Sequence, residues 1–593
     1  MKKFLDAVIV LIAFHSNNII SQDKDVEEVV VTSSFVNTTE VLNPIYVIDG
    51  DDFLDGATTS LGEAIDGYLG VSIADYGAAV GQPIIRGMSG PRVKILKNGM
   101  VNRDVSGLGV DHLNDVDLND IEQVEIVMGP SSLLYANGTT GGIINIVDDC
   151  ISALNYELPE LKVGYETQSV NDGSAESFNF KNNIGGFNVN FGYKNIDFDN
   201  YEVPHGAVLH EEEEGHDDHD DHDEEEHHDE DMGFINNSDY AVEATKFGIS
   251  KVTDWGYIGF SMDNLESVYG IPFHGDEHGD EHGDDDHEDE EGHDEHGEER
   301  IFSTTDSESF TIKGSYNVNG NLVNKVDFTY RESDYTLTEA HEEEEGHDDH
   351  GDEEEHAPTT FANEAVEYGA IFDISNDNAD QKVVINIVDE DNSIVGEEAF
   401  MNPANNEEFT VGYYISKDLD LFNVDLGMRI DQIERSGSVT DEVHKDVDNY
   451  SIDDTTNSFA VSVGRNLSDN LDISLGYASV ERLPSVIELF MNGPHMATGR
   501  FEVGDPTLQS ETSNNFDITL NYEKNGFYAY ASFYVTDVDN YIALIDEEED
   551  HDDHEDEHHE DEDHEDEHHD EDEHGDDHDD HGHGNLILSL IHI

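Results

Sequence analysis

The sequence has very little cysteine, tryptophan and basic charge. One cysteine, Cys150, and one tryptophan occur in 593 residues, and 26 Lys and Arg stand against 140 Asp and Glu. A single cysteine excludes a disulfide framework and an all-thiolate metal cluster within one chain. The formal net charge of −114 excludes a nucleic-acid partner that is held through its phosphates.

The sequence also lacks a long apolar run. No stretch of about 18 apolar residues is present, which excludes helices that span a bilayer. The N-terminal MKKFLDAVIVLIAFHSNNIIS combines two lysines with a short apolar run over residues 7–14. This combination is typical of a secretory signal peptide, which we expect at residues 1–22.

Strand patterns fill the chain after about Leu161. Apolar residues recur there at every second position in short runs, a period that predicts strands. Pairs of such runs flank Gly, Asn or Asp turn signals and predict hairpins over residues 178–198, 241–264, 309–336 and 516–535. We count roughly fifteen strands. Soluble β-sandwiches share this alternation with membrane barrels, so the period alone does not choose between them.

Four segments mix histidine with Asp and Glu and contain no Lys or Arg. They cover residues 205–231, 274–299, 339–356 and 546–584, and they hold 28 of the 33 histidines. The run HEEEEGHDDH occurs twice, at 210–219 and 341–350. Runs of Asp and Glu alone would be solvated charged loops, but imidazole favours transition metals such as Zn, Ni and Cu.

Such segments cannot bury a core, so we expect them to offer many exchangeable sets of metal ligands. The histidines that we single out as auxiliary loop ligands are His210, His216, His219, His278, His282, His341, His347, His350, His554 and His558.

The order of long and short connections indicates a barrel. One hairpin with a short turn separates each His-rich segment from the next long segment, and alternate connections of an antiparallel meander lie at the same end. All four segments and residues 483–511 should therefore project from one end, as in outer-membrane β-barrels. Such barrels close with an even number of strands. An odd count predicts missing strands, and we assign no strand to residues 588–593.

Residues before the barrel resemble TonB-dependent receptors. Residues 27–34, EEVVVTSS, resemble the box through which the TonB protein pulls these receptors, and residues 61–100 and 121–148 resemble their plug domain. Within the plug region, Arg86-Gly87 and Gly129-Pro130 should end strands, and Gly141-Gly142 should allow close backbone approach. Residues 481–517 are similar to the corresponding barrel segment of the zinc-type receptors.

The resemblance implies a mainly β fold, a transmembrane antiparallel β-barrel with an N-terminal α+β plug inside it. The family has 22 strands, so the barrel would be incomplete here. The implied divisions are a signal peptide at 1–22, a TonB box at 27–34, a plug at 35–150 and a barrel at 151–593. We expect an outer-membrane monomer in contact with lipid, without enzymatic activity. Glu27 to Ser34 would bind the TonB–ExbB–ExbD complex, and zinc would be the transported ion and not a prosthetic group.

The resemblance also implies a fixed metal site. An Asp-His pair on the plug, a loop histidine and a barrel glutamate form it in zinc-type receptors, and Asp111, His112, His495 and Glu355 match those positions. The alternative is that His112 and His495 are loop histidines that form hydrogen bonds where plug and barrel meet.

Two other functions stay open. A receptor for an iron–siderophore or haem would need aromatic or cationic loops for an anionic ligand, which acidic loops repel. A surface protein that only buffers metal would need neither the plug motifs nor the box at 27–34.

Metal capture by the four segments should weaken on mild acidification. Surrounding carboxylates stabilise the protonated imidazolium, and protons compete with metal for neutral imidazole. We expect zinc affinity to fall as the pH is lowered from about 7.5 to about 5.5. A pH titration of zinc binding checks this, and unchanged affinity over the range would contradict it.

Overall fold

A computed structural model describes most of the chain. The described residues are 46–50, 60–76, 79–107, 112–204, 207, 233–272, 300–318, 320–342, 358–396, 399–419, 421–440, 445–468, 470–495, 500–524, 527–547 and 587–592. They fall in one compact unit. None of the helices formed by these residues has the length and hydropathy needed to cross a bilayer.

Residues 46–148 form a small α+β domain, the plug, which the sequence predicts. Its five-stranded sheet has the order β1-β6-β7-β4-β5, and β2 and β3 form a separate hairpin. The strands are β1 (Tyr46–Asp49), β2 (Val71–Tyr76), β3 (Val80–Ile85), β4 (Val93–Lys97), β5 (Met100–Val101), β6 (Ile121–Val127) and β7 (Gly142–Asp148). The helical turns are α3 (Leu61–Ile65), η1 (Gly90–Arg92) and η2 (Ser132–Leu134).

Local chemistry explains these elements. Ser60 caps α3 by accepting a hydrogen bond from the backbone N–H of Glu63. Arg86, with φ of 51°, follows the end of β3 as expected. Gly142 starts β7 with φ of 115°, and a Cβ there would lie 2.6 Å from the carbonyl oxygen of Val127. Only glycine therefore lets β7 approach β6 at this point.

Most of the described residues after the plug form one large antiparallel sheet, which we call the wall, and β21 (Asn492–His495), β22 (Arg500–Val503), β25 (Ile542–Glu547) and β26 (Ile587–His592) form a separate four-stranded sheet. The 15 strands of the wall pair in sequence order from β8 to β24, except that β20 pairs with β23, and the predicted count is confirmed. They are β8 (Glu160–Gln168), β9 (Gly173–Ile184), β10 (Phe187–Phe198), β11 (Tyr240–Thr253), β12 (Gly256–Gly270), β13 (Arg300–Asn317), β14 (Lys325–Glu342), β15 (Thr359–Asp373), β16 (Asp380–Val395), β17 (Ala404–Asp418), β18 (Asn423–Thr440), β19 (Val447–Ser468), β20 (Leu471–Arg482), β23 (Glu511–Lys524) and β24 (Phe527–Asp539). The four predicted hairpins are all present.

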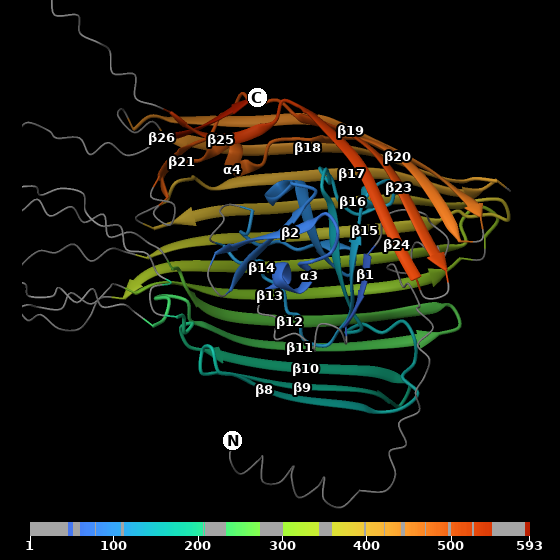
Figure 1. The fold of residues 1–593 in the computed structure, drawn as a ribbon, viewed down its shortest axis with the longest axis horizontal. Helices are drawn as coiled ribbons and strands as arrows, with labels where there is room; N and C mark the ends of the chain where they lie inside the picture. The colour runs from blue at the N-terminus through green and yellow to red at the C-terminus, as the bar shows by residue number, and fades with distance from the viewer. Residues whose placement is uncertain are drawn as a thin grey trace, which may run out of the picture. The chain divides into compact units, whose positions relative to one another are not determined.

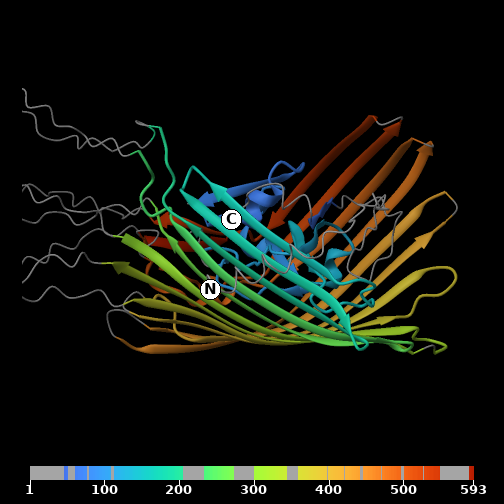
Figure 2. The same ribbon diagram turned by 90° about the horizontal axis from the view of Figure 1, so that it is seen from below.

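The wall is apolar outside and polar inside. On β18, Met428 and Ile430 are 51% and 52% exposed, whereas Arg429 and Asp431 between them are 2% and 1% exposed. The long strands curve round the plug, drawn in blue in Figures 1 and 2. The inward polar side chains therefore face the plug, and the exposed apolar face is what a lipid-facing barrel requires.

Long connections share one end of the wall. Because the strands pair antiparallel in sequence order, the connections β10–β11, β12–β13, β14–β15 and β20–β23 lie at the same end, as predicted. The last of these contains α4 (Val486–Phe490), β21 (Asn492–His495) and β22 (Arg500–Val503). The His-rich segments themselves lie almost wholly outside the described residues.

Three predicted boundaries were wrong. Residues 339–342 belong to β14, because its ladder with β13 continues to the pair Arg300 and Glu342. Residues 546–547 belong to β25 (Ile542–Glu547). Residues 588–592, to which we assigned no strand, lie in β26 (Ile587–His592), which pairs with β25 and β22. Backbone pairing extends strands into acidic sequence whose composition resembles a loop.

A buried charge cluster joins the plug to the wall. Glu511 of β23 accepts hydrogen bonds from Arg92 of the plug and, at 2.6 Å, from Nε of Arg482 of β20. Arg482 also binds both carboxylate oxygens of Glu488 in α4, at 2.7 and 2.9 Å. Arg92 and Glu511 are 7% and 2% exposed. Each buried charge is therefore paired, as burial requires.

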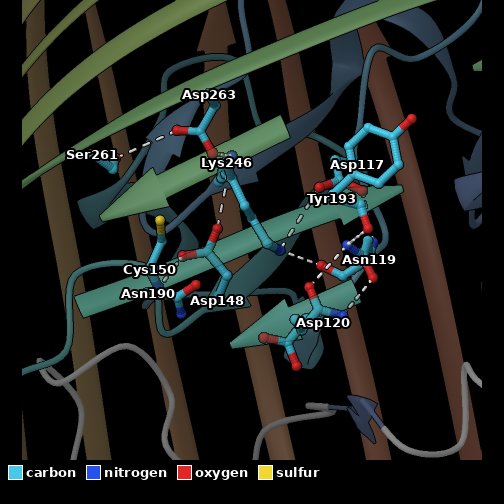
Figure 3. A network of polar contacts seen from close by, with 12 residues as sticks. Asp117, Asn119, Asp120, Asp148, Cys150, Asn190, Tyr193, Lys246, Ser261 and Asp263 are labelled. Carbon is cyan, nitrogen blue, oxygen red and sulfur yellow. Dashed lines mark hydrogen bonds and ion pairs between the residues drawn. The ribbon is translucent and has the colours of Figure 1, made fainter. Parts of the chain in front are cut away.

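A second polar network joins the plug to β11 and β12 (Figure 3). Lys246 of β11 donates a hydrogen bond to the backbone oxygen of Asn119 and lies 3.7 Å from a carboxylate oxygen of Asp117. Here the plug also supplies a cation to the wall: Lys97 of the plug binds Asp263 of β12 at 2.7 Å and lies 3.7 Å from Asp148. Plug and wall thus neutralise each other's charges on this side.

Removal of the Glu511 charge should loosen the plug. Glu511→Gln leaves the buried guanidinium of Arg92 without a carboxylate, which costs about 3 kcal/mol for a buried pair that loses one member. We expect the plug to become protease-sensitive at lower urea concentration in detergent. Glu523→Gln on the exposed part of the same strand is the matched control. Equal urea midpoints for the two variants would contradict the role of the cluster.

Candidate functional site

The structure brings two predicted site residues together. His112, in the plug loop before β6, and His495, at the end of β21, stack with ring centroids 5.9 Å apart and an interplanar angle of 14°. Their exposed fractions are 0% and 2%. Residues 383 positions apart thus form one buried imidazole pair that spans plug and loop.

Each imidazole faces a carboxylate. Nδ1 of His495 lies 3.1 Å from Oε1 of Glu502 in β22, and Nδ1 of His112 lies 3.7 Å from Oε1 of Glu339 in β14. Both carboxylates are buried, with 3% and 8% exposure. A carboxylate beside one ring nitrogen orients the ring and makes the other nitrogen more basic, an arrangement that is usual for metal-binding histidines.

Aromatic rings surround the pair. The ring of Phe361 from β15 packs 5.1 Å from His112, and the ring of Phe400 packs 4.8 Å from His495. These two rings are also 5.9 Å from each other. The apolar surroundings exclude water, which strengthens the interaction of an ion with the imidazoles and carboxylates.

Hydrogen bonds from β3 hold the loop that carries His112. The Gln82 side-chain amide donates to the backbone oxygens of Ser106, at 2.7 Å, and His112, at 3.3 Å. The Asp104 carboxylate accepts from the backbone N–H groups of Ser106 and Asp115. The backbone around His112 is therefore fixed on both sides.

A short helix positions His495. Ser485 and Glu488 form a capping box at the start of α4, and Glu488 is bound to Arg482 in the charge cluster. After the helix, the chain packs against Phe400, where a Cβ on Gly493 would lie 2.8 Å from the Phe400 Cα. The loop histidine is thus tied to the cluster that holds the plug.

Other predicted ligands lie outside the described residues. Asp111 and Glu355 do so, and so do all the auxiliary histidines except His341. The backbone of His341 pairs with Ile301 within β14.

Sequence reasoning missed two residues, Glu339 and Glu502. Glu339 continues the inward face of β14 after Tyr335 and Leu337, a period-two signal that could have found it. Glu502 has no such signal, because its approach to His495 depends on the β21–β22 pairing.

The pair of His112 and His495 supplies only part of the ligands that a metal ion needs. Among the described residues, no group of three or more His, Cys, Asp or Glu side chains is arranged to hold a metal ion. Zinc takes four donors in structural sites and keeps one position open in catalytic sites. Two imidazoles with adjacent carboxylates can contribute two nitrogen ligands and local negative charge.

Asp115, three residues after His112, is a buried carboxyl group with a raised pKa. Its pKa is raised to about 7, mainly by burial and also by the nearby Asp104 carboxylate, against the lowering effect of a hydrogen bond with Ser307. The side chain is therefore partly protonated near neutral pH.

The Asp115 carboxyl should make the folded state less stable as the pH rises. Its folded pKa of about 7 exceeds the unfolded value of 3.8, so its stabilising effect is full below about pH 4 and is lost as the pH rises to about 7. Asp115→Asn stays neutral. Relative to the unaltered protein, its unfolding free energy should rise across that range by at most about 4 kcal/mol. Urea unfolding at several pH values measures this, and a pH-independent difference would refute it.

Known proteins share this architecture. Residues 37–143 match the family described as TonB-dependent receptor plug domain, and residues 162–553 match the TonB-dependent receptor-like β-barrel. The hemin receptor of Yersinia enterocolitica is 28% identical over 157 residues. That match covers 26% of this chain and only 22% of the receptor's length.

Solved structures are similar in fold at low identity. The copper transporter OprC has a TM-score of 0.64 at 13% identity, and the Serratia marcescens hemophore receptor HasR, solved with its hemophore HasA and heme, has 0.63 at 12%. Each match covers 85% of this chain and 74% of the other. The FrpB iron transporter of Neisseria meningitidis has a TM-score of 0.61 at 13% identity, over 84% of this chain and 73% of its own.

The barrel match spans about two thirds of the sequence, and it coincides with the sheet whose apolar face points outward. The plug match covers the small domain that this sheet encloses. The chain belongs to the TonB-dependent receptors, a family of bacterial outer-membrane proteins.

Proposed function

We propose that this receptor captures a transition-metal ion, zinc in the first place, and imports it with energy from the TonB complex. The observation that carries the proposal is the buried pair of His112 and His495, each with Nδ1 directed at a carboxylate. Imidazole is a ligand for zinc, nickel and copper, whereas calcium and magnesium prefer oxygen.

The His-rich segments would act as an antenna for this pair. They carry 28 histidines and no Lys or Arg, so they attract cations and offer many weak ligand sets. Three of them leave the wall at the end where His495 lies, which is on the β20–β23 connection. Ions held there would reach the pair over a short distance.

Force on Glu27 to Ser34, which lie outside the described residues, would then shift or partly unfold the plug and open a path. Family membership supports this coupling, because TonB-dependent receptors are transporters and not enzymes. The identity of the metal rests on this chain's own residues. Copper is the second candidate for the transported metal, because the Irving–Williams order gives copper a higher affinity than zinc for the same ligands.

A haem or siderophore receptor is the other candidate. The similarity to a hemin receptor and to the fold of HasR favours it. The acidic segments oppose it, because they repel the anionic ligands of such receptors. A protein that only buffers metal is the third candidate, and it would need neither the plug nor the TonB box.

Energy-dependent uptake of labelled zinc tests the proposal. We expect deletion of residues 27–34 to abolish uptake while surface binding of zinc remains. His112→Ala and His495→Ala should each lower uptake at limiting zinc by about tenfold or more, because each removes an imidazole ligand. Glu502→Gln should weaken uptake by about 10- to 100-fold, as is typical when a metal-binding histidine loses the carboxylate that orients it.

His444→Ala, a histidine outside the pair and outside the four acidic segments, is the control and should leave uptake unchanged. Equal accumulation with and without residues 27–34 would overturn import in favour of adsorption. Competition by haem or a ferric siderophore, with no effect of excess zinc, would favour the other receptor class.

A further inference from the structure

A polar cavity of about 200 Å³ lies between the plug and the wall. The plug side includes Lys94 and Arg103, and the wall side includes Glu390 of β16 and Glu408 of β17. Gln82 borders the same cavity, and its side chain also binds the backbone of His112. The cavity therefore begins at the loop that carries His112.

A cationic side chain of the plug, Arg103, pairs with carboxylates of the wall at this cavity. One terminal nitrogen of Arg103, Nη1, lies 2.9 Å from Glu390, and the other, Nη2, lies 3.8 Å from Glu367 of β15. Glu408 accepts a hydrogen bond from the side chain of Asn137, also in the plug, at 3.0 Å. Glu390 thus takes an ion-pair partner, and Glu408 a hydrogen bond, from a domain that is separate from the wall.

Neutral oxygen donors complete the surroundings. Asn363 lines the cavity, is 2% exposed, and donates through Nδ2 to Glu390 at 2.9 Å. Its Oδ1 atom accepts no hydrogen bond from any described residue. A buried amide oxygen without a donor costs free energy, and a cation would satisfy it.

The charge balance of the cavity depends on the plug. On the wall side the cavity is lined by two carboxylates and two guanidinium groups. They are Glu390, Glu408, Arg429 and Arg435, and Arg429 is paired with Asp431. The plug contributes Lys94, Arg103 and the carboxyl group of Asp104. Withdrawal of Arg103 with the plug would leave Glu390 without its ion-pair partner.

We propose that Glu390 and Glu408, with Asn363, form a transit site for a divalent cation, which Arg103 fills while the plug is seated. The proposal rests on the import function stated above and adds a second binding step to it. When the plug shifts, Arg103 withdraws and the incoming ion replaces its charge on the wall.

The donor atoms fit a transit role. All are oxygens, whereas the entry pair offers imidazole nitrogen, which borderline metals prefer. Zinc should therefore be held more weakly on the wall than at the histidine pair. Weak holding allows the ion to leave the site, which conduction requires.

Uptake measurements separate this site from the histidine pair. Glu390→Gln with Glu408→Gln should lower the TonB-dependent uptake of labelled zinc about tenfold or more, because two charged ligands are lost. Surface binding of zinc should not change. Glu407→Gln removes an exposed carboxylate next to Glu408 on the outer face of β17, and it should import at the unaltered rate.

The Arg103→Gln variant tests whether loss of the ion pairs between plug and wall is enough to lower uptake. It removes the same ion pairs between plug and wall but keeps the wall carboxylates, so uptake should be retained or raised. A loss of uptake in the double glutamine variant is then not explained by a loosened plug. Uptake at the unaltered rate in that variant, at equal outer-membrane level, would overturn the proposal.

Crystals of the full-length Arg103→Gln receptor soaked in manganese provide an independent readout. An anomalous peak between Glu390 and Glu408, absent from the unaltered protein, is expected, and its absence would overturn the proposal. If the unaltered receptor imports no zinc, the proposed function fails, and the manganese peak alone decides whether the wall site exists. If the double variant fails to reach the outer membrane, the manganese peak in Arg103→Gln is the deciding measurement.

Discussion

Charged side chains that point into the barrel need partners there, and the plug supplies them. Burial of an unpaired charge costs several kcal/mol, so inward charges that lack a partner on the wall constrain the domain that fills the interior. Glu511 takes Arg92, Glu390 takes Arg103, and Lys246 takes Asp117. These pairs lie on well-separated strands of the wall. These ion pairs thereby fix the plug from several directions.

The end with the long loops is built differently. An apolar cluster there unites plug residues such as Val105 and Leu113 with wall and loop residues such as Phe361, Phe400 and Phe490. The two histidines and their carboxylates are embedded in this cluster. Polar contacts therefore hold the middle of the plug, and hydrophobic packing organises the binding end. The link between the two is α4, which buries apolar residues and also pairs Glu488 with Arg482.

The sequence predicts most of the fold because its signals are local. Alternating apolar residues and Gly or Asn turns define hairpins such as β9–β10 and β11–β12 without knowledge of any distant partner. Strand ends were harder to predict, since residues 339–342 are acidic yet pair with β13. Composition describes how a segment interacts with water, whereas a ladder depends on the neighbouring strand.

The site was only partly predictable. His112 and His495 could be named because a family pattern matched them, and the structure brings them together. Glu502 could not, because its contact with His495 depends on the register of β21 and β22, whereas the alternation along β14 carried a signal for Glu339. The charges that line the interior, such as Glu390, look like solvent-facing residues in the sequence, because an inward position of a barrel alternates in the same way as an outward position of a soluble sheet.

The imidazole pair is divided between two bodies, one ring on the plug and one on a loop of the wall. Neither body alone presents both nitrogens, so affinity for a shared ion exists only at one separation of the two. Any displacement of the plug that carries His112 away from His495 leaves such an ion with half of its imidazole ligands. One displacement of the plug would then control both the capture and the release of the ion. The receptor would need no competing ligand to release the ion.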